Sequence, residues 1–323
     1  MILRRTKLLL FLTAITATVC LAGVYAPISA NEAETKAIAF LVREVPAWPK
    51  NNGCFSCHNN GDAARALYSA TRKGVTVSAD ALAATNNWLS KPGGWKDNKG
   101  DPGFSDKRLA NIQFAAALLA AIEAGQLRQL KDHSPLAEAA RLLIPDQSEN
   151  GAWKIDAGTT PGSPATYGTP LATLMALRVL KAANLPEAKP AIQKAENWLR
   201  QTNPNNVLTA AALLMFSIET TDRQKQADSL KLIRVAQTSD GGWGPYADSP
   251  PEVFDTAVVL LALSELKDRS AVEAAIQRGR KFLVKEQQPD GSWPETTRPS
   301  GGESYAQRMS TTGWATLALL ATR

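Results

Sequence analysis

The sequence predicts an all-α fold built from about six helical hairpins, and three observations predict it. Units of similar length recur along the 323 residues. Each unit pairs an amphipathic helix with one that is more uniformly apolar. Alternating runs of β-branched residues, which are typical of strands, are nearly absent, whereas alanine is abundant. A hairpin of this kind cannot bury its apolar face alone, so neighbouring hairpins must stack.

The repeat is clearest at a tryptophan that follows the first helix of a unit. Three gap-free copies begin with an aromatic or aliphatic residue, pass a glutamine and a glycine at fixed offsets, and end in tryptophan: Leu142–Trp153, Leu232–Trp243 and Phe282–Trp293. A shorter copy is Trp88–Trp95, and a longer one is Phe40–Phe55. In another unit, residues 203–206 replace the turn. The chain therefore contains six units.

The two helices of each unit differ in polarity. First helices such as 191–200 and 274–286 have one apolar face, which suits an outer position. Second helices are apolar on all sides, as buried helices are, and examples are 112–124, 171–183, 208–218 and 253–266. We expect the second helices to form an inner ring and the first helices an outer ring. The prediction is an (α/α)6 toroid or closed ring, with an open superhelix as the alternative that periodicity leaves open.

The last copy, Arg278–Trp293, resembles the repeat motif of squalene–hopene cyclases and related triterpene cyclases. The resemblance is partial around Gln147 and Gln237, and weaker repeats extend it over essentially all of the chain after residue 30. It implies an (α/α)6 toroid and a structural role for the motif, in which glycine permits a tight turn and glutamine bonds to neighbouring backbone. We expect the tryptophans to be scaffold residues and not substrate contacts: Trp95, Trp153, Trp243 and Trp293.

The resemblance also allows a comparison of catalytic residues. Class II cyclases protonate an alkene with a buried Asp-x-Asp-Asp at the start of an inner helix, and the matching segment here is 252–257. Asp255 fits the pattern, but Phe254 stands where the family has its proton-donating middle aspartate, and phenylalanine has no proton to give. Glu252 and Asp255 remain weak catalytic candidates, since both also suit the first turn of a helix.

The alternative function is therefore an isoprenoid cyclase-like or prenyltransferase-like enzyme that uses the central cavity. Protein prenyltransferases share the toroid and bind zinc through Asp, Cys and His, but the later repeats carry no such set. The substitution at Phe254 argues against terpene cyclase activity, and a shared fold does not transfer a reaction.

The segment Cys54-Phe55-Ser56-Cys57-His58 is a CxxCH string, the pattern of c-type haem attachment. Two thiols bond to the haem vinyl groups, and the adjacent histidine reaches the iron. We predict covalent haem c on Cys54 and Cys57 with His58 as an iron ligand. A Cys54–Cys57 disulfide, a dithiol redox pair and a metal site are the alternatives, although zinc would need further ligands.

The position of the CxxCH segment places the predicted haem in the fold. It occupies the loop where other copies carry their Gly-x-Trp turn, before a helix expected at about 63–72. Asp62 then corresponds in position to Asp255. The haem is expected on one rim of the ring, near the start of the first inner helix.

The sixth iron ligand is left open by the sequence. His133 is the only other histidine, in a polar loop that suits a surface residue. Met175, Met215 and Met309 lie in or beside apolar helices, where methionine usually fills core space. The iron could also lack a sixth protein ligand, which would favour binding of a small ligand.

Residues 1–30 have the pattern of an export signal. Basic residues at 4–7 precede an apolar stretch from 8 to about 26 and then small residues, with cleavage expected after Ala30. An uncleaved membrane anchor is the alternative. Cys20 falls within this leader. Without the leader's three basic residues the net charge drops from +6 to +3, which is too mild to indicate nucleic-acid binding.

The domain organisation and function follow from these observations. Residues 31–323 are expected to form one exported, periplasmic repeat domain that carries haem c for electron transfer or haem-linked ligand sensing. A redox partner protein and a hydrophobic ligand in the cavity are the candidate partners. A scaffold protein stabilised by a disulfide is the third hypothesis.

Overall fold

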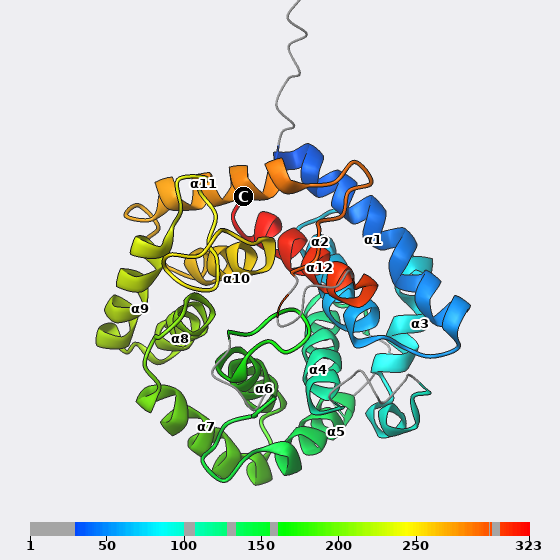
Figure 1. Cartoon of the computed structure of the whole chain (residues 1–323). Helices are drawn as coiled ribbons and strands as arrows, with labels where there is room; N and C mark the ends of the chain where they lie inside the picture. The colour runs from blue at the N-terminus through cyan, green and yellow to red at the C-terminus, as the bar shows by residue number, and fades with distance from the viewer. Residues whose placement is uncertain (1–29, 100–106, 128–133, 156–160, 297, 299–303) are drawn as a thin grey trace, which may run out of the picture.

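The computed structural model describes residues 30–99, 107–127, 134–155, 161–296, 298 and 304–323. Helices of these residues form two concentric rings, seen along their common axis in Figure 1. The outer ring contains α1 (Ala30–Asn52), α3 (Ala79–Leu89), α5 (Ser134–Leu143), α7 (Lys189–Gln201), α9 (Arg223–Ala236) and α11 (Glu273–Glu286). The inner ring contains α2 (Ala64–Arg72), α4 (Lys107–Glu123), α6 (Thr169–Ala183), α8 (Val207–Thr220), α10 (Val253–Ser264) and α12 (Tyr305–Ala321). The predicted (α/α)6 toroid is confirmed.

The inner helices are buried because their sequences are apolar on all sides. Every residue of α8 from Val207 to Ser217 is buried, and so is every residue of α12 from Met309 to Leu320. In contrast, α9 buries only Ser229, Ile233 and Ala236, the single apolar stripe of an outer helix. No strand occurs among the described residues beyond one isolated bridge between Trp243 and Glu252.

In three units, the repeated tryptophans connect the outer helix to the inner helix that follows it. Their indole N–H groups donate to carbonyls near the ends of the outer helices, from Trp153 to Leu143 (2.8 Å), Trp243 to Ile233 (2.8 Å) and Trp293 to Leu283 (2.6 Å). Their backbone N–H groups donate to threonine hydroxyls of the inner helices at Thr173, Thr256 and Thr312. Trp95 makes a similar indole contact in the shorter copy, with the carbonyl of Trp88 (3.2 Å). The scaffold role predicted for these tryptophans is thus consistent with their contacts.

The last hairpin docks on the first helix and closes the ring. The Gln287 amide donates to the carbonyl of Ala33 in α1 (2.8 Å), as Gln147 and Gln237 donate to the next outer helix in their own units. The buried carboxylate of Glu34, also in α1, pairs with Arg280 of α11 (3.3 Å) and with Arg323. In Figure 1, α11 accordingly lies end to end with α1. The choice between ring and superhelix, which the sequence left open, is settled as a ring.

The first inner helix begins earlier than the sequence indicated. We expected a loop up to Asp62, but Cys57–Ala63 form a π-helix, η1, that runs directly into α2. Ser56 begins it, since its hydroxyl accepts from the backbone N–H groups of His58 (3.2 Å) and Asn59 (3.4 Å). Wide π-turns of this kind are rare and concentrate at functional sites.

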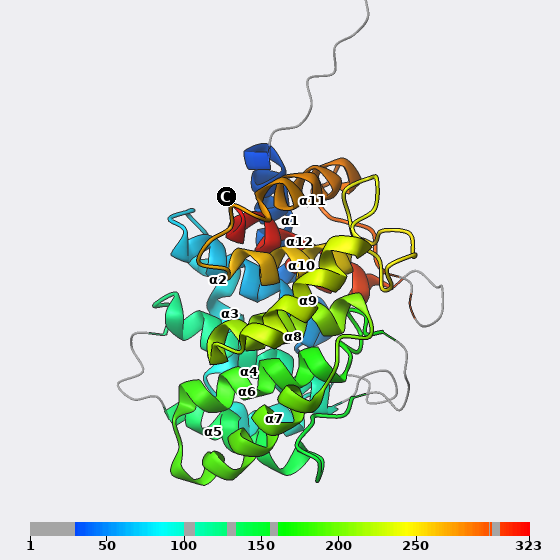
Figure 2. The same ribbon diagram turned by 90° about the vertical axis from the view of Figure 1, so that its left-hand side faces the viewer.

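The loops that lead from outer to inner helices gather on one face of the ring, on the right in Figure 2. We call this the long-loop face, and the CxxCH segment lies on it, between α1 and η1. The predicted leader falls almost wholly outside the described residues, since α1 begins at Ala30. Among the helices that the structure describes, none has the length and apolarity needed to span a bilayer.

Candidate functional site

Cys54 and Cys57 flank a short turn at the start of η1, on the long-loop face. Cys54 is half-buried, Cys57 is 8% exposed, and both thiols are free. Burial raises the pKa of the Cys57 thiol to about 12, and the negative charge of Asp62 adds to this effect. Cys57 therefore remains a protonated thiol at neutral pH when the ring is folded.

The hydrogen bonds around His58 determine where its proton lies. Its Nδ1 is 2.7 Å from the hydroxyl oxygen of Ser310, and the Ser310 hydroxyl donates to Oδ2 of Asp62 (2.8 Å). A hydroxyl has only one proton to give, so towards His58 it acts as the acceptor and Nδ1 carries the hydrogen. Burial lowers the His58 pKa, more than the charge of Asp62 raises it. The neutral imidazole thus has its lone pair on Nε2, the form that binds a metal.

Asp62 gathers side chains from several parts of the ring around one fully buried carboxylate. It accepts from Gln113 of α4 (2.8 Å), from Ser310 of α12 and from the Tyr167 hydroxyl, and it pairs at 3.5 Å with Arg65 of α2. Burial raises the pKa of the Tyr167 phenol well above its ordinary value, so the phenol remains a donor. The position of His58 is therefore fixed by a network that reaches across the ring.

This network was not anticipated from the sequence. Asp62 was expected to resemble Asp255 in position, and both are fully buried at the start of inner helices. Ser310, Gln113 and Tyr167 were missed. The one available signal was the polar run Ser310–Thr312 inside an otherwise apolar helix.

Aromatic side chains and unpaired polar atoms border the CxxCH segment. Phe55 stacks on Trp88 (4.5 Å between ring centroids), and Trp48 stacks on Tyr305 (5.5 Å), whose hydroxyl accepts from the Asn59 amide. The indole nitrogens of Trp48 and Trp88 are buried without a hydrogen-bond partner among the described residues. Unsatisfied donors of this kind call for an explanation, and an anionic carboxylate is a suitable acceptor.

The segment thus brings together two free thiols, a neutral imidazole with its lone pair on Nε2, flat aromatic side chains and unpaired indole donors. Among the described residues, no group of three or more His, Cys, Asp or Glu is arranged to hold a metal ion.

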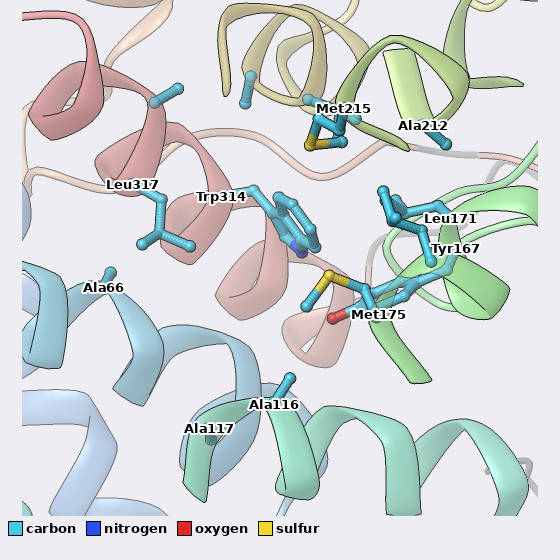
Figure 3. Close-up of a cluster of buried hydrophobic side chains, with 14 of the residues drawn as sticks. Ala66, Ala116, Ala117, Tyr167, Leu171, Met175, Ala212, Met215, Trp314 and Leu317 are labelled. Carbon is cyan, nitrogen blue, oxygen red and sulfur yellow. The ribbon is translucent and has the colours of Figure 1, made fainter. Parts of the chain in front are cut away.

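Figure 3 shows where two of the candidate sixth ligands lie. Met175 of α6 and Met215 of α8 point into the apolar cluster on the ring axis, together with Trp314 and Tyr167. Met309 is fully buried in α12. These three methionines occupy core positions, as expected for most methionines. His133 lies outside the described residues.

The second candidate site surrounds Asp255 at the start of α10. Burial raises the pKa of this carboxyl to about 7, the charge of Glu252 raises it further, and Arg298 opposes both. Arg298 pairs with Asp255 (2.8 Å) and with Glu252 (2.5 Å), the residue at the N-terminal cap of α10. Phe254 packs edge-on against Trp314 (5.7 Å) in the core. Asp255 can act as a proton donor near neutral pH, but its carboxyl group is already paired with Arg298.

Apolar side chains of the described residues occupy the axis of the ring near these acids. Side chains of Trp314, Tyr167, Met175, Leu171 and Met215 project into the axis of the ring (Figure 3). One cavity of about 180 Å³ lies beside Tyr167 and Trp198, and another of about 190 Å³ lies between α2, α4, α6 and α12. Both are below the few hundred Å³ typical of pockets that enclose a drug-sized ligand.

Sequence comparison relates part of the chain to a known family. The sequence model described as "Squalene-hopene cyclase C-terminal domain" matches residues 202–323, less than half of the chain. None of the curated proteins matches in sequence.

Comparison with solved structures relates the whole ring to known enzymes. A variant of the type II terpene cyclase MstE from Scytonema, in complex with geranylgeranyl dihydroxybenzoate, is 16% identical with a TM-score of 0.56, over 91% of this chain and 97% of that one. An unsaturated glucuronyl hydrolase specific for heparin is 12% identical with a TM-score of 0.60, over 91% and 96%. At these identities the likeness shows a shared α/α-toroid fold, and these two enzymes carry out different reactions on it.

Proposed function

We propose that this protein is an exported α/α-toroid protein that carries one covalent haem on Cys54 and Cys57, with His58 as an iron ligand. The observation that carries the proposal is the pair of free thiols beside a neutral imidazole whose proton is held on Nδ1 by Ser310. A hydrogen bond at the far ring nitrogen is the usual means by which proteins orient a metal-binding histidine. The haem would supply a one-electron redox centre, so the proposed activity is electron transfer.

Attachment requires only the two thiols and the haem vinyl groups. Each S–H adds across a vinyl double bond, so that a carbon–sulfur bond forms and the hydrogen moves to the neighbouring carbon, with no oxidant consumed. Cys57 is 8% exposed in the folded ring. The addition is therefore expected before this segment packs against α12. Export by the predicted leader would deliver the chain unfolded to a compartment where haem is attached.

The direct test is expression with the leader and a c-type haem maturation system, followed by absorption spectroscopy of the denatured, extracted protein. We expect a haem spectrum that stays with the polypeptide in acid and organic solvent. Cys54→Ala and Cys57→Ala should each lose one thioether bond, and the double variant should lose all bound haem. His58→Ala should keep a covalent haem with an altered axial ligand. A colourless wild-type protein would refute the proposal.

A second candidate function is an enzyme that acts on an isoprenoid substrate, with Asp255 as the acid. It is supported by the Asp255 pKa of about 7, by the family match over residues 202–323 and by the likeness to a terpene cyclase. The absence of an acid at Phe254 and the filled axis oppose it. Incubation with geranylgeranyl dihydroxybenzoate, the substrate of MstE, and product analysis would test it. A cyclised product that disappears in Asp255→Asn would support this candidate, and unchanged substrate would exclude it for that substrate class.

A further inference from the structure

The cavity between α2, α4, α6 and α12 is lined by six apolar residues and five polar or charged ones. Its volume is about 190 Å³, and four inner helices contribute to it. Figure 3 labels three of its lining residues, Ala116, Met175 and Leu317, beside Trp314. The apolar walls comprise Ala116, Leu119, Ala120, Met175, Val179 and Leu317. Such walls favour a ligand with an aliphatic part.

Arg65 lines this cavity and has one carboxylate partner, Asp62, with which it forms an ion pair but no hydrogen bond. Arg65 is only 12% exposed, yet its guanidinium makes no side-chain hydrogen bond to any described residue, and Nη1 is fully buried. It lies 4.7 Å above the Trp314 ring and 3.5 Å from Asp62, whose oxygens already accept from Gln113 and Tyr167. Nη1 therefore lacks a hydrogen-bond partner among the described residues, which is costly for a buried donor, and an anion that bonds to the guanidinium would lower that cost.

The other two arginines at the cavity are already paired. Arg72 bonds to Glu123 (2.5 Å), and Arg178 bonds to Glu219 (2.6 Å) and Glu265 (2.7 Å). The positive charges of Arg72 and Arg178 are therefore balanced by nearby glutamates. Among the three lining arginines, Arg65 is the one that forms no hydrogen bond with its carboxylate partner, so its guanidinium is the most available to an anionic group.

We infer that this cavity binds a small anionic amphiphile, an alkyl carboxylate, with its carboxylate on Arg65 and its chain against the apolar walls. A planar carboxylate can accept two parallel N–H bonds from a guanidinium, which a point-like anion does less well. The inference does not depend on haem attachment, because none of the lining residues belongs to the CxxCH segment.

Octanoate is a suitable probe, with titration calorimetry of the full protein as the measurement. Acetate tests the head group alone, and octan-1-ol tests the chain alone. We expect octanoate to bind at one site, at least 10-fold more tightly than either control, since the site uses both parts. Octan-1-ol binding as tightly as octanoate, or no octanoate binding up to ~10 mM, would overturn the inference.

Variants locate the site. Arg65→Met keeps the length and apolar stem of the side chain and should weaken octanoate binding at least 10-fold. Arg141→Met, which removes an exposed arginine paired with Glu187 outside the cavity, should change octanoate binding less than about 3-fold. Ala120→Phe should fill the cavity and abolish binding with Arg65 intact, so the result stands even if Arg65→Met folds poorly. Wild-type affinity in a folded Arg65→Met or Ala120→Phe would place octanoate elsewhere and refute the site.

Discussion

The hydroxyl of Ser310 lies between His58 and Asp62 and has one proton to share between them. It gives that proton to Asp62, so His58 must donate from Nδ1. The tautomer of His58, and with it the availability of Nε2, therefore depends on a residue that lies 252 positions away in the chain.

Ser310→Ala should release this constraint. We expect His58 to change from the Nδ1–H form to a mixture of tautomers, and the free energy of unfolding to fall by about 1–3 kcal/mol, because buried Asp62 loses a donor. Nitrogen-15 NMR of the haem-free protein measures the tautomer, and the chain has only two histidines to resolve. Thr316→Ala is the matched control, since its hydroxyl bonds within α12. An unchanged His58 signal in Ser310→Ala would contradict the assignment.

Asp255 makes stability depend on pH. Its pKa is about 7 in the folded protein against an ordinary value of 3.8, so the folded state holds its proton more tightly than the unfolded chain. Its contribution to stability is therefore fully present below about pH 4 and is lost as pH rises towards 7, by up to about 1.4 kcal/mol per pH unit.

Urea unfolding of the wild type and of Asp255→Asn between about pH 4 and pH 8 measures this contribution. The difference in unfolding free energy, variant minus wild type, should increase up to about pH 7 and then level off. A flat difference for Asp255→Asn would show that this carboxyl ionises as in the unfolded chain.

Only some of the residues around His58 could be predicted from the sequence. Cys54, Cys57 and His58 are recognisable because their spacing is local. Ser310 and Gln113 are not recognisable from the sequence, because each belongs to a different hairpin. They become partners of Asp62 only when the ring has folded.

The turn between the outer and the inner helix has the same backbone conformation in three of the units. Gly151, Gly241 and Gly291 all have positive φ, and each lies against the backbone of the next outer helix. A Cβ on Gly291 would lie 2.3 Å from the carbonyl oxygen of Lys36. Both the conformation and the space therefore require glycine.

Gly291→Ala and Gly74→Ala separate these two requirements. Both glycines have positive φ, but a Cβ on Gly74 would meet nothing within 4 Å. We expect Gly74→Ala to cost about 1–2 kcal/mol from backbone strain alone, and Gly291→Ala to cost clearly more. Urea unfolding measures both, and equal losses would show that the close approach to Lys36 is not important for stability.

The helices and the turn motif were predictable because their signals are periodic and local. The π-helix Cys57–Ala63 was not, because its turn is stabilised by contacts from elsewhere. The Asn60 amide, for example, donates to the carbonyl of Val45 in α1 and to the hydroxyl of Thr85 in α3. Asparagine and glycine in sequence indicate a turn, and tertiary contacts decide its type.

The whole molecule depends on its first and last hairpins meeting. Periodicity could count six units but not decide closure, since each unit specifies only its contact with the next. The contact that closes the ring is of the same kind as those between earlier units. In each, a glutamine amide donates to an alanine carbonyl of the next outer helix, and the acceptors are Ala191, Ala275 and, at the closure, Ala33.

Gln287→Leu should weaken this closure selectively. It removes the amide that bonds to Ala33 of α1. We expect faster hydrogen exchange in α1, because its docking on α11 is loosened. Gln147→Leu is the matched control, and it should increase exchange in α7 and leave α1 unchanged. Equal exchange of α1 in both variants would contradict the docking contact as a determinant of closure.

The shared toroid does not identify the reaction, because a terpene cyclase and a glucuronyl hydrolase have it too. The proposed function rests on the thiol pair and imidazole on the long-loop face. Intact-protein mass spectrometry after expression with haem maturation tests that most directly. The account predicts the chain mass plus one haem, lost in Cys54→Ala/Cys57→Ala. A wild-type mass equal to the unmodified chain, or lower by two hydrogens as in a disulfide, would contradict it.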